Sequence, residues 1–159
     1  MKKIPVLRES RIPFTKEGYQ NLLDEKEKLL AQRPEAVEHL RKAREMGDLS
    51  ENGYYKASRQ RLSFLDSRIR RLERLIRLAT IVQSSGAGVV EIGCRVTVSD
   101  GTREYIYMLV GGYESDPAKM TISHMSPLGR ALMGKKQSDV VSVDAPAGKK
   151  TYTIISIDQ

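Results

Sequence analysis

Two carboxylates, Asp48 and Glu51, lie three residues apart in a short segment between two long helical patterns. Asp at an N-cap with Glu at the third helical position forms a capping box, which contributes about 1 kcal/mol to the following helix. Ser50 is an alternative cap. The same two carboxylates also supply the oxygen ligands that Mg²⁺ prefers, although two alone bind it weakly. They would then complete a metal site held mainly by another molecule, such as a phosphodiester enzyme with two metal ions about 4 Å apart. The spacing leaves both roles open.

Two helical patterns flank this turn. Thr15 is the expected N-cap of the first helix, Arg33-Pro34 predicts a kink or a one-turn break, and Gly47 is the expected stop. The second helix has a coiled-coil seam at Leu62, Leu65, Ile69, Leu72, Ile76 and Ala79. A short turn between long helices predicts an antiparallel hairpin, roughly 40 Å long at about 1.5 Å per residue. The alternative is the core of a larger helical bundle, but no further long helical pattern follows.

The positive charge is confined to one half of the chain. Residues 1–80 hold 19 of the 27 basic and 12 of the 20 acidic side chains, and therefore carry the whole net charge of +7. Such a basic half attracts an anionic partner, either a nucleic acid or an acidic protein channel. A merely solvated helix face with solubilising arginines is the alternative. The basic side chains are densest in the second helix, at Lys56, Arg59, Arg61, Arg68, Arg70, Arg71, Arg74 and Arg77.

The C-terminal half has a different pattern. Residues 84–88 are rich in Ser and Gly and predict a linker, and the residues after them predict short strands around 95–98, 103–110, 120–123, 139–143 and 150–157. Pro127 to Met133 predicts a short helix with Ser126 as its N-cap. The chain is therefore expected to be an α+β protein, with an antiparallel two-helix coiled coil followed by a small, mainly antiparallel sheet domain.

Conventional active-site patterns are missing from the sequence. His39 and His124 lack neighbours at metal-ligand spacing, Cys94 lacks an activating partner, and Gly111-Gly112 is typical of a turn at a strand end. We therefore expect no independent enzyme and no stably bound cofactor. No apolar run is long enough to span a membrane and no signal peptide is evident, so the expected location is the cytoplasm.

Two separated motifs carry a family resemblance. The first is the segment 47–52 with Tyr55 and the basic helix behind it, and the second is the segment 122–132 with Asp139-Val140-Val141. In this order and at these separations they resemble the Gre transcript-cleavage factors (GreA/GreB) of bacterial RNA polymerase. The resemblance extends from Phe14 to Ile157. Arg59-Gln60-Arg61-Leu62 and the arginine-rich second helix are more similar to the GreB side of the family.

The resemblance implies three regions: a coiled-coil domain at 1–83 with an acidic tip at 47–52, a linker at 84–88, and an FKBP-like, polymerase-docking domain at 89–159. It implies a monomeric transcription elongation factor that enters the secondary channel of RNA polymerase. There the factor would stimulate cleavage of backtracked nascent RNA at its 3′ end. DNA binding and a bacterial setting are expected with it. Asp48 and Glu51 match the tip acids that share the Mg²⁺ of the polymerase, with Leu49, Ser50, Asn52 and Tyr55 in support. Lys56, Arg59, Arg61 and Arg68 would face RNA or the channel wall, and Ser126 and Pro127 match the rim-docking motif.

Three features depart from the family pattern. Gly53-Tyr54 replaces an Ala and an acid, Met125 replaces an Asp or Asn before Ser-Pro, and residues 1–13 extend the usual start. A channel-binding regulator or inhibitor without cleavage activity is the alternative function. A third hypothesis is prolyl isomerisation by the C-terminal domain, although fold does not determine function.

Overall fold

The structure is a computed structural model that describes residues 10–46, 53–145 and 148–159. The chain folds into two compact units. One unit comprises residues 20–78, and the other joins residues 1–19 to residues 79–159. The segment before residue 20 therefore belongs to the unit that contains the sheet, although the helical residues 20–78 separate it from the sheet in the sequence.

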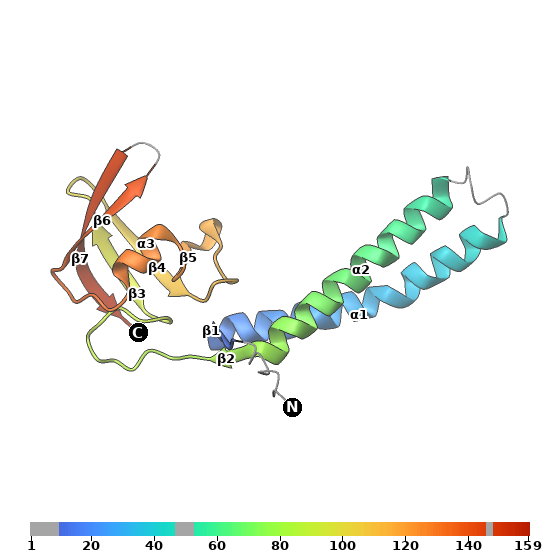
Figure 1. The fold of residues 1–159 in the computed structure, drawn as a ribbon, viewed down its shortest axis with the longest axis horizontal. Helices are drawn as coiled ribbons and strands as arrows, with labels where there is room; N and C mark the ends of the chain where they lie inside the picture. Colours follow the sequence, from blue (N-terminus) through green and yellow to red (C-terminus); the bar gives the residue numbers. More distant parts are fainter. Residues whose placement is uncertain (1–9, 47–52, 146–147) are drawn as a thin grey trace, which may run out of the picture. The chain divides into compact units, whose positions relative to one another are not determined.

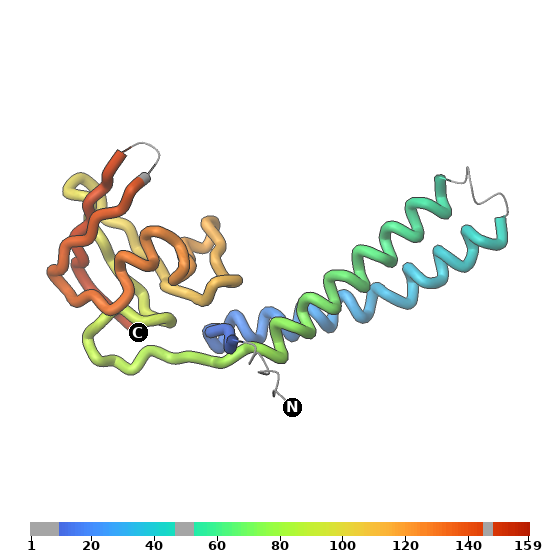
Figure 2. Tube along the Cα trace, viewed as in Figure 1, coloured from blue at the N-terminus to red at the C-terminus, as the bar shows by residue number. Residues whose placement is uncertain are grey.

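The helical unit consists of two antiparallel arms, α1 (Lys16–Glu45) and α2 (Gly53–Leu78). Their traces run in opposite directions (Figure 1, Figure 2), and the ion pairs Arg33–Asp66 and Arg68–Glu25 show that they lie side by side. The apolar side chains that are buried between the arms are Leu22, Ala36, Leu40 and Ala43 from α1 and Leu65, Ile69, Leu72, Leu75 and Leu78 from α2. The predicted hairpin is therefore confirmed. Its seam is only partly as predicted, because Leu65, Ile69 and Leu72 are buried, whereas Leu75 and Leu78 are buried in place of Ile76 and Ala79.

The predicted break at Arg33-Pro34 is wrong, because α1 continues through Pro34 without interruption. Proline removes one helical hydrogen bond and crowds the preceding turn. Pro34 lies on the exposed side, however, while Ala36, two residues later, is buried against the second arm. Packing on the far side of the proline thus keeps the helix continuous, and it buries Ala36 while Val37 is 40% exposed.

The base of the helical arms is joined by a feature that the sequence did not predict. β1 (Ile12–Phe14) pairs in parallel with β2 (Ala79–Ile81), so Ala79 leaves the expected helical seam and enters a strand. Phe14 is fully buried there. The expected cap at Thr15 is confirmed, since its hydroxyl accepts a hydrogen bond from the Gly18 amide at 3.0 Å.

Glu114 binds the same helix start from the loop after the fourth strand. Its carboxylate accepts hydrogen bonds from the Thr15 amide at 3.0 Å, from the Thr15 hydroxyl and from the Gly111 amide at 2.9 Å. A carboxylate at a helix N-terminus is favoured by the helix dipole. A Cβ atom at Gly111 would lie 2.2 Å from the Pro13 carbonyl oxygen, so glycine is required for this close approach.

The sheet unit is a five-stranded mixed sheet of order β5-β4-β3-β7-β6. Its strands are β3 (Arg95–Ser99), β4 (Glu104–Val110), β5 (Thr121–Ser123), β6 (Val140–Ala145) and β7 (Gly148–Asp158). All neighbouring pairs are antiparallel except β4 with β5. The 3₁₀ turn η1 (Pro117–Lys119) and the helix α3 (Pro127–Leu132) flank β5. The predicted α+β fold is confirmed.

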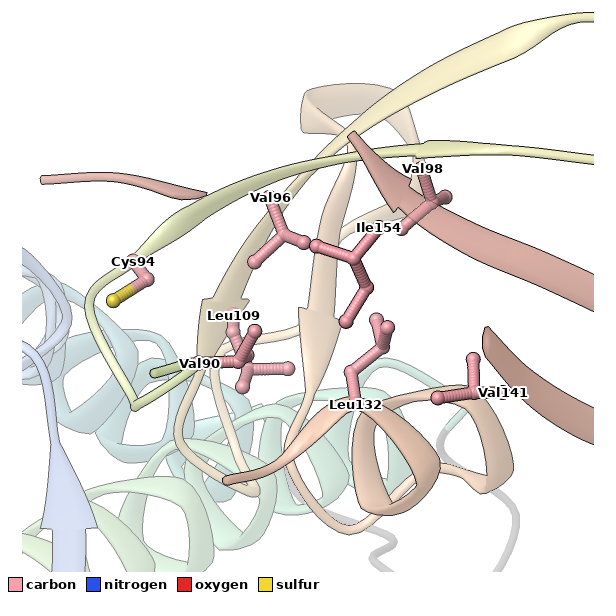
Figure 3. Close-up of a cluster of buried hydrophobic side chains, with 8 residues drawn as sticks. All are labelled: Val90, Cys94, Val96, Val98, Leu109, Leu132, Val141 and Ile154. Carbon is pink, nitrogen blue, oxygen red and sulfur yellow. The ribbon is translucent and has the colours of Figure 1, made fainter. Parts of the chain in front are cut away.

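The core of the sheet unit lies between the curled sheet and α3. Its buried side chains are Val90, Cys94, Val96, Val98, Leu109, Leu132, Val141 and Ile154 (Figure 3). Leu132 projects from α3 toward Ile154 of β7, which fastens the short helix to the sheet. Burying each such aliphatic side chain stabilises the fold by about 1.5 to 3 kcal/mol. Cys94 is one of these core residues and carries a free, buried thiol.

Candidate functional site

The acidic turn itself lies outside the described residues. This applies to the predicted tip residues Asp48, Leu49, Ser50, Glu51 and Asn52. The structure does describe both sides of the turn, where α1 ends at Glu45 and α2 begins at Gly53. Tyr55, predicted to support the tip, is half-buried in the first turn of α2.

A hydrogen bond joins the two arms directly beside the turn. Nδ1 of His39 in α1 lies 2.7 Å from the hydroxyl of Tyr54 in α2. His39 also contacts Glu35, one helical turn earlier, with 3.3 Å between Nε2 and Oε1. From the sequence, His39 was interpreted as a surface or packing residue, and Tyr54 was noticed only as a departure from the family pattern. The available signal was an aromatic hydroxyl at the first turn of one arm and a histidine near the end of the other.

Ion pairs connect the arms farther from the turn. Arg33 binds Asp66 at 2.7 Å, and Arg68 binds Glu25 at 2.7 Å. The hydrogen bond from Arg33 holds the pKa of Asp66 below its usual value, so this carboxyl group remains ionised. Exposed pairs of this kind each contribute little free energy, but they fix how the arms lie against each other.

The predicted RNA-facing residues fall into two groups. Arg61 and Arg68 extend across to α1, where they pair with Glu35 at 3.5 Å and with Glu25. Lys56 and Arg59 are exposed on α2, and the structure shows no carboxylate paired with either among the described residues. The second group is therefore the more accessible to an anionic partner.

An exposed aromatic side chain lies on the same outer face of α2. Phe64 is 67% exposed, and it borders a shallow depression lined by Arg59, Gln60, Ser63 and Ser67. Cations beside an exposed aromatic ring are characteristic of surfaces that bind single-stranded nucleic acid. Sequence reasoning missed Phe64, although its position between Leu62 and Leu65 already placed it outside the apolar seam.

The predicted docking residues lie where β5 meets α3. The Ser126 hydroxyl accepts a hydrogen bond from the Gly129 amide at 3.0 Å and caps α3, while Pro127 occupies the first turn. Both local predictions are confirmed. Pro127 is exposed and Met125 beside it is 63% exposed, so this corner presents an apolar surface suited to a protein partner. His124 is half-buried and its amide donates to the Val110 carbonyl at 2.9 Å.

Membrane spans and metal clusters are both missing from the residues that the structure describes. None of their helices is long and apolar enough to cross a membrane. No group of three or more His, Cys, Asp or Glu side chains in the same residues gathers in a way that could hold a metal ion.

Models of one protein family match both halves of the chain. Residues 12–81 match the model described as transcription elongation factor, N-terminal, and residues 84–159 match the model described as transcription elongation factor, GreA/GreB, C-terminal.

Individual relatives match over nearly the full length. Transcription elongation factor GreA of Lactococcus lactis subsp. cremoris (strain SK11) is 40% identical over 155 residues, which are 94% of this chain and 99% of the relative. The GreA of Paracoccus denitrificans (strain Pd 1222) is 39% identical over 151 residues, 92% of this chain and 97% of the relative. Among solved structures, GreA factor homolog 1 (Gfh1) of Thermus thermophilus is 27% identical, with 94% of this chain and 99% of that chain covered and a TM-score of 0.44.

Proposed function

Because this chain belongs to the GreA/GreB family of transcription elongation factors, we propose that it enters the secondary channel of bacterial RNA polymerase and stimulates cleavage of backtracked nascent RNA. The observation that carries this proposal is the antiparallel pair of arms whose connecting turn contains Asp48 and Glu51. Arms of 30 and 26 residues present that turn far from their base, at about 1.5 Å per residue. The protein would act in the cytoplasm as a monomer.

The chemistry proposed for the turn is assistance at the polymerase's own active site. Asp48 and Glu51 offer carboxylate oxygens, which are the donors that Mg²⁺ accepts, but two such ligands are too few for a stable site. The Mg²⁺ of the polymerase supplies charge neutralisation and an activated water for phosphodiester hydrolysis. The role of this chain is to add ligands and to orient the water, with Leu49, Ser50, Asn52 and Tyr55 shaping the turn. The chain has no hydrolytic activity of its own in this proposal.

Two other surfaces complete the proposal. Lys56 and Arg59, with Arg61 and Arg68 beside them, would face the 3′ segment of the extruded RNA or the channel wall. The exposure of Lys56 and Arg59 supports this. Ser126 and Pro127 would dock on the polymerase rim, which the exposed apolar corner at the start of α3 supports.

The test uses a stalled, backtracked elongation complex. Asp48→Asn and Glu51→Gln keep side-chain size but remove the negative charge, so each should lower the cleavage rate by roughly 10- to 100-fold, the range for weakened metal-site support. Both variants should still compete with the unmodified protein for the channel. Unchanged cleavage by both would exclude the tip mechanism. If the unmodified protein blocked nucleotide addition and left the RNA intact, the chain would instead be a channel-binding inhibitor.

A further inference from the structure

Three side chains form a continuous polar chain between the arms near the turn: Glu35, His39 and Tyr54. The distances are 3.3 Å from Glu35 Oε1 to His39 Nε2 and 2.7 Å from His39 Nδ1 to the Tyr54 hydroxyl oxygen. The His39 and Tyr54 rings also meet edge to face, with centroids 6.2 Å apart and an interplanar angle of 82°. A neutral imidazole that carries its proton on Nε2 donates to Glu35 and accepts from Tyr54, so both of its nitrogens have partners.

This bridge lies at the point where the chain leaves one arm and enters the other. Tyr54 is the second residue of α2, and His39 precedes the end of α1 at Glu45 by less than two helical turns. Glu35 makes a second connection to α2 through Arg61, at 3.5 Å. The polar chain therefore holds both ends of the segment that carries the tip acids.

Apolar packing is thin in this part of the hairpin. The first buried hydrophobic residue of α2 is Leu65, eleven residues after Tyr54, and the buried residue before it is Ser58. After Pro34, α1 buries three residues. Two of them, Ala36 and Ala43, have small side chains and therefore bury little apolar area. The placement of the two arms beside the turn must then depend largely on hydrogen bonds, because these fix orientation more narrowly than apolar contacts do.

Gly53, the residue before Tyr54, adds backbone freedom to the first turn of α2, and the hydrogen bond between Tyr54 and His39 restricts it. Gly53 begins α2, and no atom lies within 4 Å of the position that a Cβ there would occupy. Glycine loses more backbone entropy than other residues when it is ordered. Without a contact from Tyr54, the first turn of α2 would be the least constrained part of the arm.

We propose that His39 and Tyr54 are positioning residues for the acidic turn, because their bridge fixes the first turn of α2, which begins two residues after Glu51 in the sequence. This inference rests on the proposed function, because its consequence is measured as cleavage. Displacement of a reacting group by about 1 Å can lower a rate by about 100-fold. The bridge therefore acts on the rate of the cleavage step and not on the affinity of the factor for the polymerase.

The experiment compares Tyr54→Phe and His39→Phe with the unmodified protein in the backtracked-complex assay, over a range of factor concentrations. Tyr54→Phe removes only the hydroxyl and keeps the ring. Each variant should lower the cleavage rate at saturating factor by roughly tenfold while the half-saturating concentration stays within about twofold. The double variant should lose no more than either single variant, since both remove the same hydrogen bond.

Arg33→Gln is the matched control, because it breaks a 2.7 Å contact between the arms that lies farther from the turn. It should keep the full cleavage rate. The positioning role is overturned if Tyr54→Phe cleaves like the unmodified protein, if Arg33→Gln loses as much, or if the two substitutions in the double variant add. These outcomes leave the proposed function intact when the unmodified protein stimulates cleavage. If the unmodified protein fails to do so, the proposed function is wrong and the positioning role falls with it.

Discussion

At the scale of single residues, Gly129 determines how closely α3 approaches the sheet. A Cβ atom there would lie 2.1 Å from the Ser123 carbonyl oxygen and 2.9 Å from its carbon, both of which are backbone atoms of β5 that cannot easily move aside. The Gly129 amide also donates to the Ser126 hydroxyl. The glycine thus allows α3 to pack on β5 and fixes the corner that presents Ser126 and Pro127.

Gly129→Ala should therefore destabilise the sheet unit by about 1 to 3 kcal/mol, the usual cost of forcing extra atoms into a packed site. Amide hydrogen exchange in β4 and β7 is the appropriate measurement, because it reports on the sheet unit separately from the helical arms. Gly53→Ala is the control, since nothing lies within 4 Å of its Cβ position. It should leave exchange in the sheet unchanged, and equal protection in both variants would contradict the packing argument.

The same corner shows what a local sequence pattern can predict. The cap at Ser126 and the position of Pro127 depend on neighbours in the chain, and both were predicted correctly. The contact between Gly129 and Ser123 joins two elements, and the contact between Glu114 and Thr15 spans 99 residues. Patterns in a single sequence carry no information on which distant backbone atoms will meet, so these two contacts could not be predicted from the sequence.

At the scale of elements, the turn between β3 and β4 depends on one ionised carboxylate. Asp100 accepts hydrogen bonds from the amides of Arg103 at 2.8 Å and Thr102 at 2.9 Å, and from the Tyr105 hydroxyl at 3.1 Å. The Arg103 amide, followed by the Thr102 amide, holds the pKa of Asp100 below its usual value. The folded state therefore favours the charged form of this side chain.

A carboxyl group with a lowered pKa in the folded state stabilises the fold above its unfolded pKa of about 3.9, and this contribution is lost as the pH falls through the folded value. Asp100→Asn should consequently be less stable than the unmodified protein at pH 7, and the difference should shrink as the pH is lowered below about 4. Urea denaturation at pH 7 and below about pH 4 measures this difference in the free energy of unfolding. An Asp100→Asn difference in stability that does not change with pH would contradict this account.

The helical elements show where periodicity succeeds and where it fails. Leu65, Ile69 and Leu72 are buried as their spacing predicts, because a regular seam is a property of the sequence itself. Pro34 was expected to interrupt α1, but burial of Ala36 against the other arm outweighs the local preference. The three-residue strands β1 and β2 were missed because so short a segment has no alternation to detect.

At the scale of the whole molecule, the distribution of charge separates the two halves of the chain. Residues 1–80 carry the net charge of +7, and residues 81–159 hold eight basic and eight acidic side chains. On α2, Arg59 lines the depression beside Phe64, and Lys56, Arg70 and Arg71 of the same helix are also exposed. Binding to a nucleic acid should therefore depend on a few cations of one helix and not on the total number of cations in the protein.

Two variants of the full chain with equal net charge test this expectation. One replaces with Gln four exposed cations of α2, and the other replaces four exposed cations of the sheet unit. Single-stranded RNA binding, measured by fluorescence anisotropy over a salt series, should weaken in the first variant, and the slope of log K against log salt should fall by up to about 3, at about 0.7 per lost phosphate contact. The four positions are Lys56, Arg59, Arg70 and Arg71 in the first variant and Lys119, Lys135, Lys149 and Lys150 in the second.

The second variant should keep both the affinity and the slope of the unmodified protein, because its substitutions lie in the half without net charge. Equal loss in the two variants would mean that binding follows the total charge and that the outer face of α2 has no particular role. Loss only in the first variant would locate the phosphate contacts on that face. Since both variants carry the same net charge, long-range attraction changes equally in the two, and the remaining difference comes from where the cations lie.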